Sequence, residues 1–210
     1  MRVYLEALGC RLNYAEMAAL GRQLTGAGHE LVASAEQADL CVLNSCAVTG
    51  EAARQSRQLA RRLARANPAA ALLVTGCYAT LEGEAAAQLP NVKLVVGNAR
   101  KDELWRIIVE SAARQEARPA GAATQSTVRG SPPAARTRAF VKVQDGCRNR
   151  CTFCIVTAAR GAERSRPIAE VIGEVNALHG AGYQEAVLTG VHLGGYGSDL
   201  GANLRSLTTA

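Results

Sequence analysis

The fold is decided by residues 39–77, which read DLCVLNSCAVTGEAARQSRQLARRLARANPAAALLVTGC. Asp39–Leu43 and Ala71–Thr75 are short apolar runs of the length typical of buried strands. Glu51–Ala66 lies between them and is predicted to form a helix. A helix that joins two buried strands is a crossover connection, so the two strands are expected to lie parallel in one sheet.

The same alternation continues on both sides of this unit. Further strands are expected over Val3–Leu8, Glu30–Ala33 and Val92–Val96, and further helices over Tyr14–Ala27, Leu81–Leu89 and Lys101–Ala113. Aromatic residues make up only 4% of the chain, so the core must be built mostly from Ala, Leu and Val, which suits helices packed on a sheet. Residues 1–113 are therefore predicted to form an α/β domain with an open parallel sheet, similar to flavodoxin or Rossmann domains.

The composition changes after residue 113. Residues 114–138 are rich in Pro, Gly, Ser, Thr and Arg and show no periodicity, which predicts a linker. A second α/β unit is expected over residues 139–210, with strands at Phe140–Gln144 and Glu185–Thr189 and a helix from Pro167 to about His179. These elements are too few to close a barrel, so the chain is expected to be a truncated piece of a larger protein or to need a partner.

Charge and cysteine content limit the possible classes of function. The 210 residues carry a formal net charge of +6, which favours polyanions such as RNA, although many basic proteins bind no nucleic acid. The apolar runs are much shorter than the roughly 20 residues of a membrane span, and Glu6 stands where a secretory signal would be apolar. A cytoplasmic protein without a membrane partner is expected. In that compartment seven cysteines, an odd number, indicate metal binding or redox chemistry.

Three cysteines, Cys147, Cys151 and Cys154, are spaced C-x3-C-x2-C directly after a predicted strand. Thiolates ligate iron well, and three of them on one loop can hold three irons of a [4Fe–4S] cluster, which leaves the fourth iron open to an outside ligand. The alternative is a structural zinc site, which usually needs four ligands. No histidine lies within this loop, so the spacing favours the cluster.

Three more cysteines, Cys10, Cys46 and Cys77, each follow the end of a predicted strand. The carboxyl ends of parallel strands meet at one edge of a sheet, so these thiols are expected to converge on a second cluster there. The alternative is that they are ordinary buried cysteines. Cys41 differs because it lies inside a strand, and it is interpreted as a core residue.

Together these motifs resemble the radical S-adenosylmethionine methylthiotransferases. The matching segments are Leu8–Asn13, Asn44–Thr49, Thr75–Ala79, Gly146–Ile155, Arg160–Gly161 and Arg164–Arg166. Within the family, Ala47–Thr49 and the pair Ser165 and Arg166 are most similar to the branch that acts on threonylcarbamoyladenosine in tRNA. Sister branches modify isopentenyladenosine in tRNA or an aspartate of a ribosomal protein.

The resemblance implies a function and a set of cofactors. Residues 139–210 would be the start of an incomplete radical S-adenosylmethionine (β/α) barrel. The loop cluster would bind S-adenosylmethionine, and the cluster on Cys10, Cys46 and Cys77 would carry or present sulfur for the methylthio group at carbon 2 of the adenine. The implied partners are tRNA, S-adenosylmethionine, an electron donor and a sulfur source. The alternative for so short a chain is a non-catalytic module that carries a cluster or binds RNA.

Three residues are weaker candidates for contacts to S-adenosylmethionine. Phe153 lies between two cluster ligands and is expected either to pack on the adenine or to be a core aromatic. Thr189 and Gly190 end the second strand of the partial barrel, where family members contact the amino end of the cofactor. No side chain is predicted to act as a catalytic acid or base.

Basic residues recur at helical spacing on the helix after Cys46: Arg54, Arg57, Arg61 and Arg65. Such a stripe is expected either to contact tRNA phosphates or to be an ordinary solvated helix face.

Overall fold

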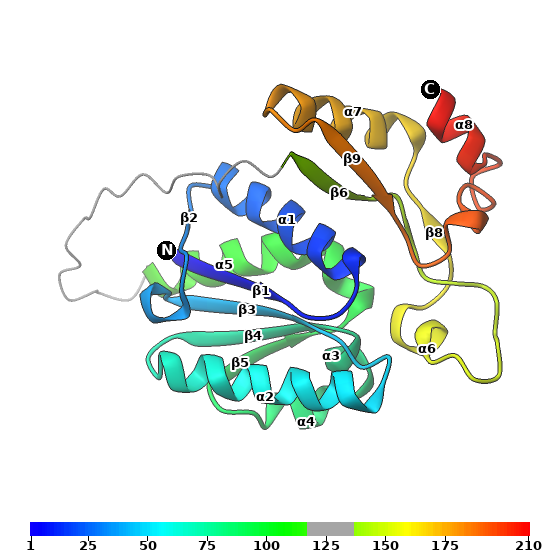
Figure 1. Cartoon of the computed structure of the whole chain (residues 1–210). Helices are drawn as coiled ribbons and strands as arrows, with labels where there is room; N and C mark the ends of the chain where they lie inside the picture. Colours follow the sequence, from blue (N-terminus) through cyan, green and yellow to red (C-terminus); the bar gives the residue numbers. More distant parts are fainter. Residues whose placement is uncertain (117–136) are drawn as a thin grey trace.

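A computed structural model describes residues 1–116 and 137–210 of the chain (Figure 1). Most of the predicted linker, 114–138, lies outside these described residues. The described parts form two α/β units, one on each side of this stretch (Figure 1).

The first unit has a five-stranded parallel sheet with the order β2-β1-β3-β4-β5. Its strands are β1 (Arg2–Ala7), β2 (Glu30–Leu31), β3 (Leu40–Ser45), β4 (Ala71–Gly76) and β5 (Val92–Val96). Its helices are α1 (Arg11–Gly26), α2 (Gly50–Ala66), α3 (Cys77–Leu81), α4 (Gly83–Ala87) and α5 (Leu104–Glu116), with short 3-10 helices η1 (Ala35–Gln37) and η2 (Asn98–Glu103). The predicted open parallel sheet is confirmed.

Several element bounds differ from the prediction. Strands β3 and β4 run two and one residues farther than expected and end directly before Cys46 and Cys77. The helix predicted over about Leu81–Leu89 is confirmed in a shorter form as α4, and a separate helix that was not predicted, α3, precedes it with a break at Glu82. The prediction missed this break because Gly83 and the alanines around it fit one helix as well as two.

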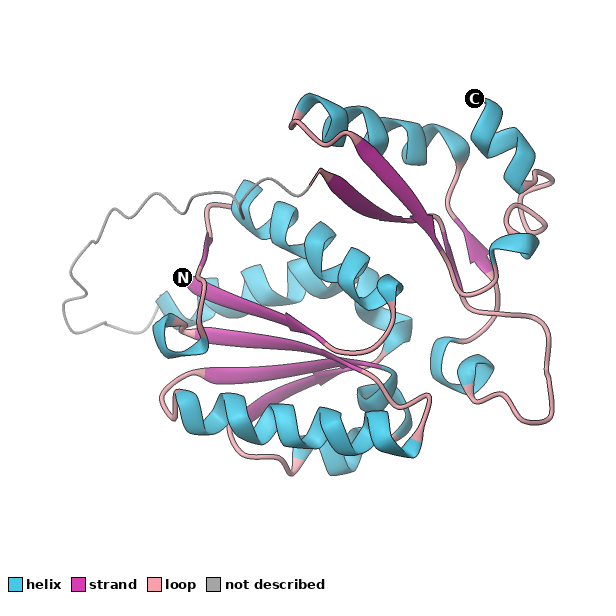
Figure 2. Ribbon diagram, viewed as in Figure 1, coloured by secondary structure: helices cyan, strands magenta, loops and turns pink. Residues whose placement is uncertain are grey.

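Helices cover both faces of the sheet (Figure 2). Successive residues of a strand point to opposite faces, so the sheet has a core on each side. On one face Cys41 and Leu43 of β3 pack in the cluster that includes Leu63 of α2. On the other face Val42 packs in the cluster that includes Leu20 of α1 and residues of α5. The interpretation of Cys41 as a core residue is confirmed, since it is 1% exposed.

The second unit is smaller. Strands β6 (Arg138–Lys142) and β9 (Glu185–Thr189) pair in parallel, and β7 (Gln144–Asp145) and β8 (Arg164–Ser165) pair antiparallel. Its helices are α6 (Val156–Arg160), α7 (Ile168–Gly180) and α8 (Leu204–Thr209), with the 3-10 helix η3 (Leu193–Gly195). The parallel strands with α7 between them in sequence are one crossover unit of the kind expected for the start of a barrel.

The two units are in direct contact. Helix α1 lies against the first sheet and also contacts β6, and α3 contacts α6 (Figure 1). These contacts bring the ends of β1, β3 and β4 toward the loop that joins β7 to α6. No helix among the described residues is long and apolar enough to span a membrane.

Candidate functional site

The three cysteines of the first unit lie at the same edge of its sheet. Cys10 precedes α1, Cys46 follows β3, and Cys77 is the first residue of α3. Cys10 is exposed, whereas Cys46 and Cys77 are buried. The structure therefore brings these three residues together at the strand ends, as the parallel arrangement predicts.

Local contacts hold the turn around Cys46 in place. Ser56 of α2 bonds to its backbone twice, accepting from Cys46 N at 3.0 Å and donating to Cys46 O at 2.7 Å. Gly9, with a φ of +103°, lies so close that a Cβ there would be 2.8 Å from Cys46 Sγ. Any side chain at position 9 would thus push apart the turns that carry Cys10 and Cys46.

Burial raises the pKa of the Cys46 thiol, and the neighbouring Cys77 and Cys10 thiols raise it further. Among the described residues, no three His, Cys, Asp or Glu side chains stand close enough to share one metal ion. Thiolates of a cubane bind three different irons, so they stand farther apart than the ligands of a single ion. The donor set of soft thiols fits an iron–sulfur cluster.

The loop cysteines lie between β7 and α6. Cys151 and Cys154 are exposed, and Cys147 is partly exposed. Cys147 N donates to Gly161 O at 3.1 Å, which ties the start of the loop to the end of α6. Gly146, with a φ of +67°, permits this approach, because a Cβ there would lie 1.9 Å from the carbonyl oxygen of Ala162.

The weaker candidates lie on both sides of this loop. Phe153 is 91% exposed in the described part of the chain. The alternative that it is a core aromatic is therefore wrong. Thr189 is buried at the end of β9 and its hydroxyl donates to Val187 O at 3.1 Å. At Gly190 a Cβ would come within 3.0 Å of the amide oxygen of Gln144.

Gln144 is a residue that the sequence analysis did not assign to the site. It is fully buried, and its amide nitrogen donates to Gly146 O at 2.7 Å, directly before Cys147. Its amide oxygen accepts from His192 N at 2.9 Å. One side chain therefore fixes the cysteine loop relative to the loop after Gly190. The available signal in the sequence was a polar residue, Gln144, at the end of a predicted apolar strand and close to Cys147.

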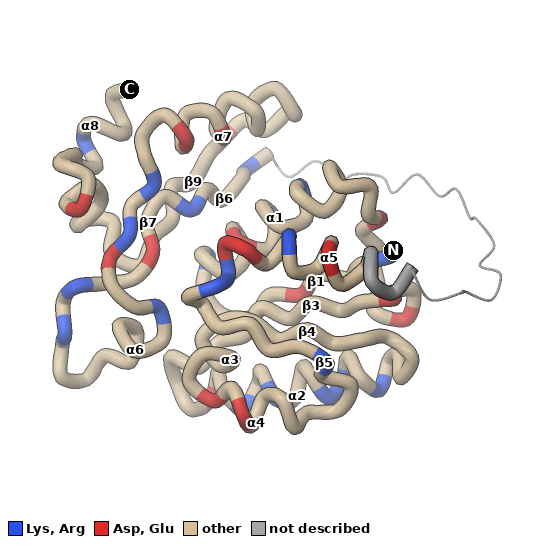
Figure 3. Tube along the Cα trace, turned by 180° about the vertical axis from the view of Figure 1, so that it is seen from behind, with Lys and Arg blue, Asp and Glu red and all other residues tan. Residues whose placement is uncertain are grey.

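A group of buried and partly buried charges joins the two units. Glu16 of α1 binds Lys101 Nζ at 2.8 Å and Arg160 Nη1 at 3.1 Å, and Lys142 Nζ lies 3.6 Å away. Arg160 also binds Asp145 Oδ1 at 2.9 Å. In Figure 3, basic and acidic stretches lie near one another around β7 and before α5. We call Glu16, Lys101, Lys142, Asp145 and Arg160 the interdomain charge cluster.

The charges in this cluster depend on one another. Burial alone would raise the pKa of the Glu16 carboxyl, but Lys101, Arg160 and Lys142 lower it to about 2. Burial opposes the charge of Arg160, yet Glu16 and Asp145 raise its pKa. No sequence motif indicates this cluster, because its members come from four separate segments of the chain. The charged residues after β5, which include Lys101, were a usable signal for charges near the cysteines, because that strand ends at the same sheet edge.

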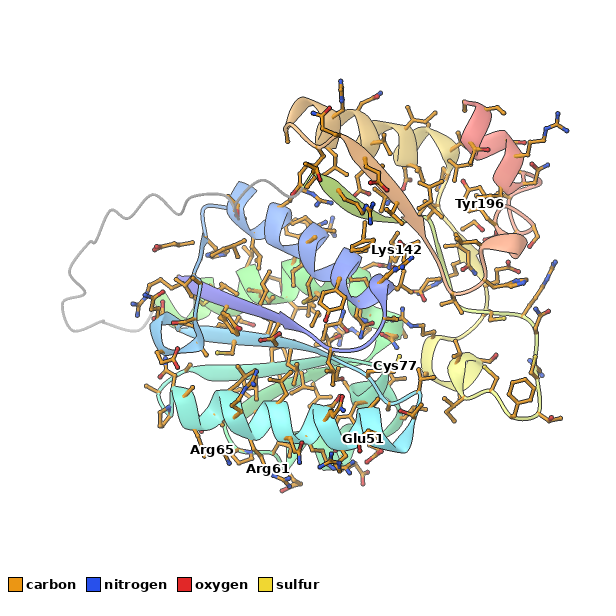
Figure 4. The ribbon with its side chains drawn as sticks, viewed as in Figure 1. Glu51, Arg61, Arg65, Cys77, Lys142 and Tyr196 are labelled. Carbon is orange, nitrogen blue, oxygen red and sulfur yellow. The ribbon has the colours of Figure 1, made fainter. Side chains whose placement is uncertain are left out.

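The arginine stripe on α2 is partly neutralised. Arg54 binds Glu51 at 2.7 Å, and Arg57 lies 3.6 Å from Glu82. Arg61 and Arg65 line a shallow groove on α2 and lie along its outer face (Figure 4). Among the ion pairs of the described residues, Arg61 and Arg65 in the second half of the stripe have no acidic partner, which leaves them available for an anion.

Two family models match the chain. The family described as "Uncharacterized protein family UPF0004" matches residues 2–97, and the Radical SAM superfamily matches residues 141–200. A structure of the radical S-adenosylmethionine methyltransferase TsrM from Kitasatospora setae is similar with a TM-score of 0.62 at 14% identity, over 99% of this chain and 50% of that chain. At that identity the likeness supports the fold alone.

Curated relatives match over nearly the whole chain. A protein of Aquifex aeolicus named threonylcarbamoyladenosine tRNA methylthiotransferase MtaB is 38% identical over 100% of this chain and 52% of its own length. A protein of the same name from Bacillus subtilis is 40% identical over 94% of this chain and 45% of its own length. The ribosomal protein uS12 methylthiotransferase RimO of an Anaeromyxobacter species is 34% identical over 97% of this chain and 44% of its own length.

The chain spans about half the length of the curated relatives it matches. Both family models fall on the two units in the order that the motifs predict. The chain belongs to the radical S-adenosylmethionine methylthiotransferase family.

Proposed function

We propose that this protein is a tRNA methylthiotransferase that adds a methylthio group at carbon 2 of N6-threonylcarbamoyladenosine beside the anticodon. The observation that carries the proposal is the placement of two three-cysteine sets at the contact between the two units. Relatives named for this tRNA reaction reach 40% identity, and a relative named for a ribosomal protein reaches 34%.

In this proposal each cysteine set holds one [4Fe–4S] cluster. Cys147, Cys151 and Cys154 would hold the cluster that binds S-adenosylmethionine, and Cys10, Cys46 and Cys77 would hold the second. When bound, these groups supply the radical and sulfur chemistry, which the protein itself does not perform.

The protein's own residues position and shield these groups. Gln144 fixes the loop that precedes Cys147, and its contact to His192 N holds the segment after Gly190 at the same place. Exposed Phe153 would close over the adenine of S-adenosylmethionine, and backbone groups at Thr189 and Gly190 would receive its amino end.

The tRNA, an electron donor and a sulfur source are the proposed partners. Arg61 and Arg65 have no carboxylate partner among the ion pairs of the described residues, so they are the members of the stripe best suited to phosphate.

The clusters are tested by anaerobic reconstitution of the chain with iron and sulfide. About eight irons and eight sulfides per chain are expected, which corresponds to two cubanes. Replacing Cys147, Cys151 and Cys154 with alanine should halve both values, whereas Cys41→Ala should change neither, because Cys41 is in the core. Stoichiometric zinc without sulfide would contradict the proposal.

The reaction is tested with the reconstituted protein, a reductant, S-adenosylmethionine and unmodified tRNA. Mass spectrometry of the nucleosides should detect 2-methylthio-N6-threonylcarbamoyladenosine. A methylthio group on isopentenyladenosine, or on a ribosomal protein aspartate, would assign the sister activities instead. If protein that holds both clusters forms no 5′-deoxyadenosine, the alternative of a non-catalytic module is favoured.

A further inference from the structure

Helix α6 connects the loop cysteines with the other cysteine set. It begins two residues after Cys154 and packs against α3, whose first residue is Cys77 (Figure 4). Its last two residues, Ala159 and Arg160, are almost completely buried. The helix that belongs to the second unit therefore ends inside the cysteine site of the first.

The first connection runs through Asn98. This side chain is 2% exposed, and its amide nitrogen lies 2.7 Å from Ala159 O and 3.7 Å from Cys77 Sγ. Its backbone N donates to Thr80 Oγ1 at 2.9 Å, which fixes its position at the end of β5. One amide group thus donates to a thiol of the first unit and to the backbone of the second.

The second connection runs through Asn13. Arg160 Nη2 donates to Asn13 Oδ1 at 2.7 Å, and Cys10 Sγ lies 3.7 Å from the same oxygen. The amide nitrogen of Asn13 donates to Leu8 O at 2.6 Å and to Ser45 O at 3.3 Å. Asn13 therefore joins the turns before Cys10 and Cys46 to the guanidinium of Arg160.

The interdomain charge cluster contains more cations than carboxylates. Lys101, Lys142 and Arg160 face two buried carboxylates, Glu16 and Asp145. The further carboxylate, Asp102, binds Lys142 at 3.2 Å, but its side chain is 68% exposed, so solvent screens it. Arg164 approaches Asp145 at 4.0 Å and is also partly exposed. Arg160 pairs with both Glu16 and Asp145, and its charge also interacts with Cys77.

We propose that Asn98 and Arg160, held by α6, are positioning residues that raise the reduction potential of the iron–sulfur group on Cys10, Cys46 and Cys77. This inference rests on the proposed function, which assigns a cluster to those cysteines. Reduction adds one electron to the cluster and increases its negative charge. A hydrogen bond to a cysteine sulfur and a nearby buried cation both stabilise the more negative state.

The test measures the potential of this cluster alone. In a background chain with Cys147, Cys151 and Cys154 replaced by alanine, only the cluster of the first unit can form. An anaerobic titration with dithionite and redox mediators, followed by electron paramagnetic resonance, gives its midpoint potential. No turnover is needed, so the readout is independent of activity.

The Asn98 variants should give a graded result. Asn98→Leu removes the donor, and Asn98→Asp replaces the donor with a negative charge, so the potential should fall in the order wild type, Leu, Asp. For Asn98→Asp the reduction equilibrium should shift by about tenfold, which is about 59 mV for a one-electron couple. If Asn98 only supported folding, the potentials of the variants would not fall in this order.

The Arg160 variants test the charge separately. Arg160→Met should lower the potential by a similar factor, whereas Arg160→Lys keeps the cation and should restore most of it. The matched control is Asn67→Leu, since Asn67 Nδ2 also donates to buried backbone, to Ala38 O at 2.9 Å, at the opposite end of β4. That variant should leave the potential unchanged.

The outcomes separate the two proposals. Failure of the background chain to bind about four irons would overturn the assignment of a cluster to these cysteines, and this inference with it. A cluster that forms with the same potential in the Asn98 and Arg160 variants as in the background would overturn the inference and leave the proposed function standing.

Discussion

Replacing Glu16 with glutamine would remove the central anion of the interdomain charge cluster while keeping the shape of the side chain. Glu16 is 7% exposed and contacts three cations, Lys101, Arg160 and Lys142. Its carboxylate also accepts a hydrogen bond from the amide nitrogen of Asn44 at 2.9 Å. In the variant these three cations would face one another with Asp145 as the only buried carboxylate within the cluster.

The size of the effect follows from two separate arguments. The cations lower the pKa of Glu16 from its usual 4.5 to about 2, and this difference corresponds to about 3 kcal/mol of stability at neutral pH. Breaking one buried ion pair by removing a single partner costs about 3–5 kcal/mol. The first argument gives about 3 kcal/mol and the second about 3–5 kcal/mol, so we expect Glu16→Gln to lose at least about 3 kcal/mol.

The pH dependence has a definite sign. Because the pKa of Glu16 is depressed in the folded chain, its contribution is fully present above about pH 4.5 and is lost as the pH falls toward about 2. Urea unfolding of the apo chain under reducing conditions, followed by circular dichroism, would measure the free energy of unfolding across this range. The wild type should lose stability between about pH 5 and 2 more steeply than Glu16→Gln.

Glu51 provides a control, because its carboxyl has a similarly lowered pKa but is not buried. The carboxyl of Glu51 also has its pKa lowered to about 2, through hydrogen bonds from Arg54 and Gln55, but it is exposed to solvent. Glu51→Gln should therefore unfold like the wild type. The reasoning is refuted by a Glu16→Gln chain whose stability lies within about 0.5 kcal/mol of the wild type and whose acid profile is unchanged.

Three further outcomes are expected. Gly146→Ala should reduce the iron that the loop cysteines bind in reconstitution, whereas Gly161→Ala should not. Both glycines have a positive φ, but of the two only Gly146 would bring an added Cβ against a backbone oxygen, at 1.9 Å. The double variant Arg61→Glu and Arg65→Glu should bind tRNA more weakly in filter-binding assays. A plot of log affinity against log salt concentration should have a slope smaller by about one per arginine. An unchanged slope would contradict contact between these arginines and tRNA phosphates. Burial raises the pKa of Cys41 to about 11, so iodoacetamide at pH 8 should alkylate the loop cysteines and spare Cys41, as peptide mass spectrometry can check; equal labelling would contradict its burial.

The fold was predictable from local patterns because each strand of the first sheet is an apolar run bounded by turn residues. The runs around Val42 and Val74 lie at the centre of the sheet, where both faces are buried, so their strands follow from composition alone. Because parallel strands end at the same edge of a sheet, the positions of Cys46 and Cys77 at that edge were also predictable. By contrast, α8 was not predicted, because six mostly polar residues after a glycine-rich stretch give no helical period.

The partners of the buried polar residues could not be predicted in the same way. Arg160 bonds to Asn13, 147 positions earlier in the chain, and Asn98 bonds to Ala159, 61 positions later. Such pairs depend on how α6 packs against the first unit, and no local pattern in the sequence records that packing. The Arg160–Gly161 match pointed to the right residue, but only the structure supplies its partners.

Helix α1 has a consequence for how this chain can change during evolution. It begins next to Cys10, carries Asn13 and Glu16 in its first turns, and pairs through Arg22 with Glu174 of α7. Because an α-helix turns by about 100° per residue, inserting a single residue after Glu16 would rotate everything beyond it away from both the first sheet and β6. Insertions and deletions should therefore be tolerated after Gly26, in the turn that leads to β2, and be selected against within the helix. Variation in the length of α1 among related chains should occur, if at all, in whole turns.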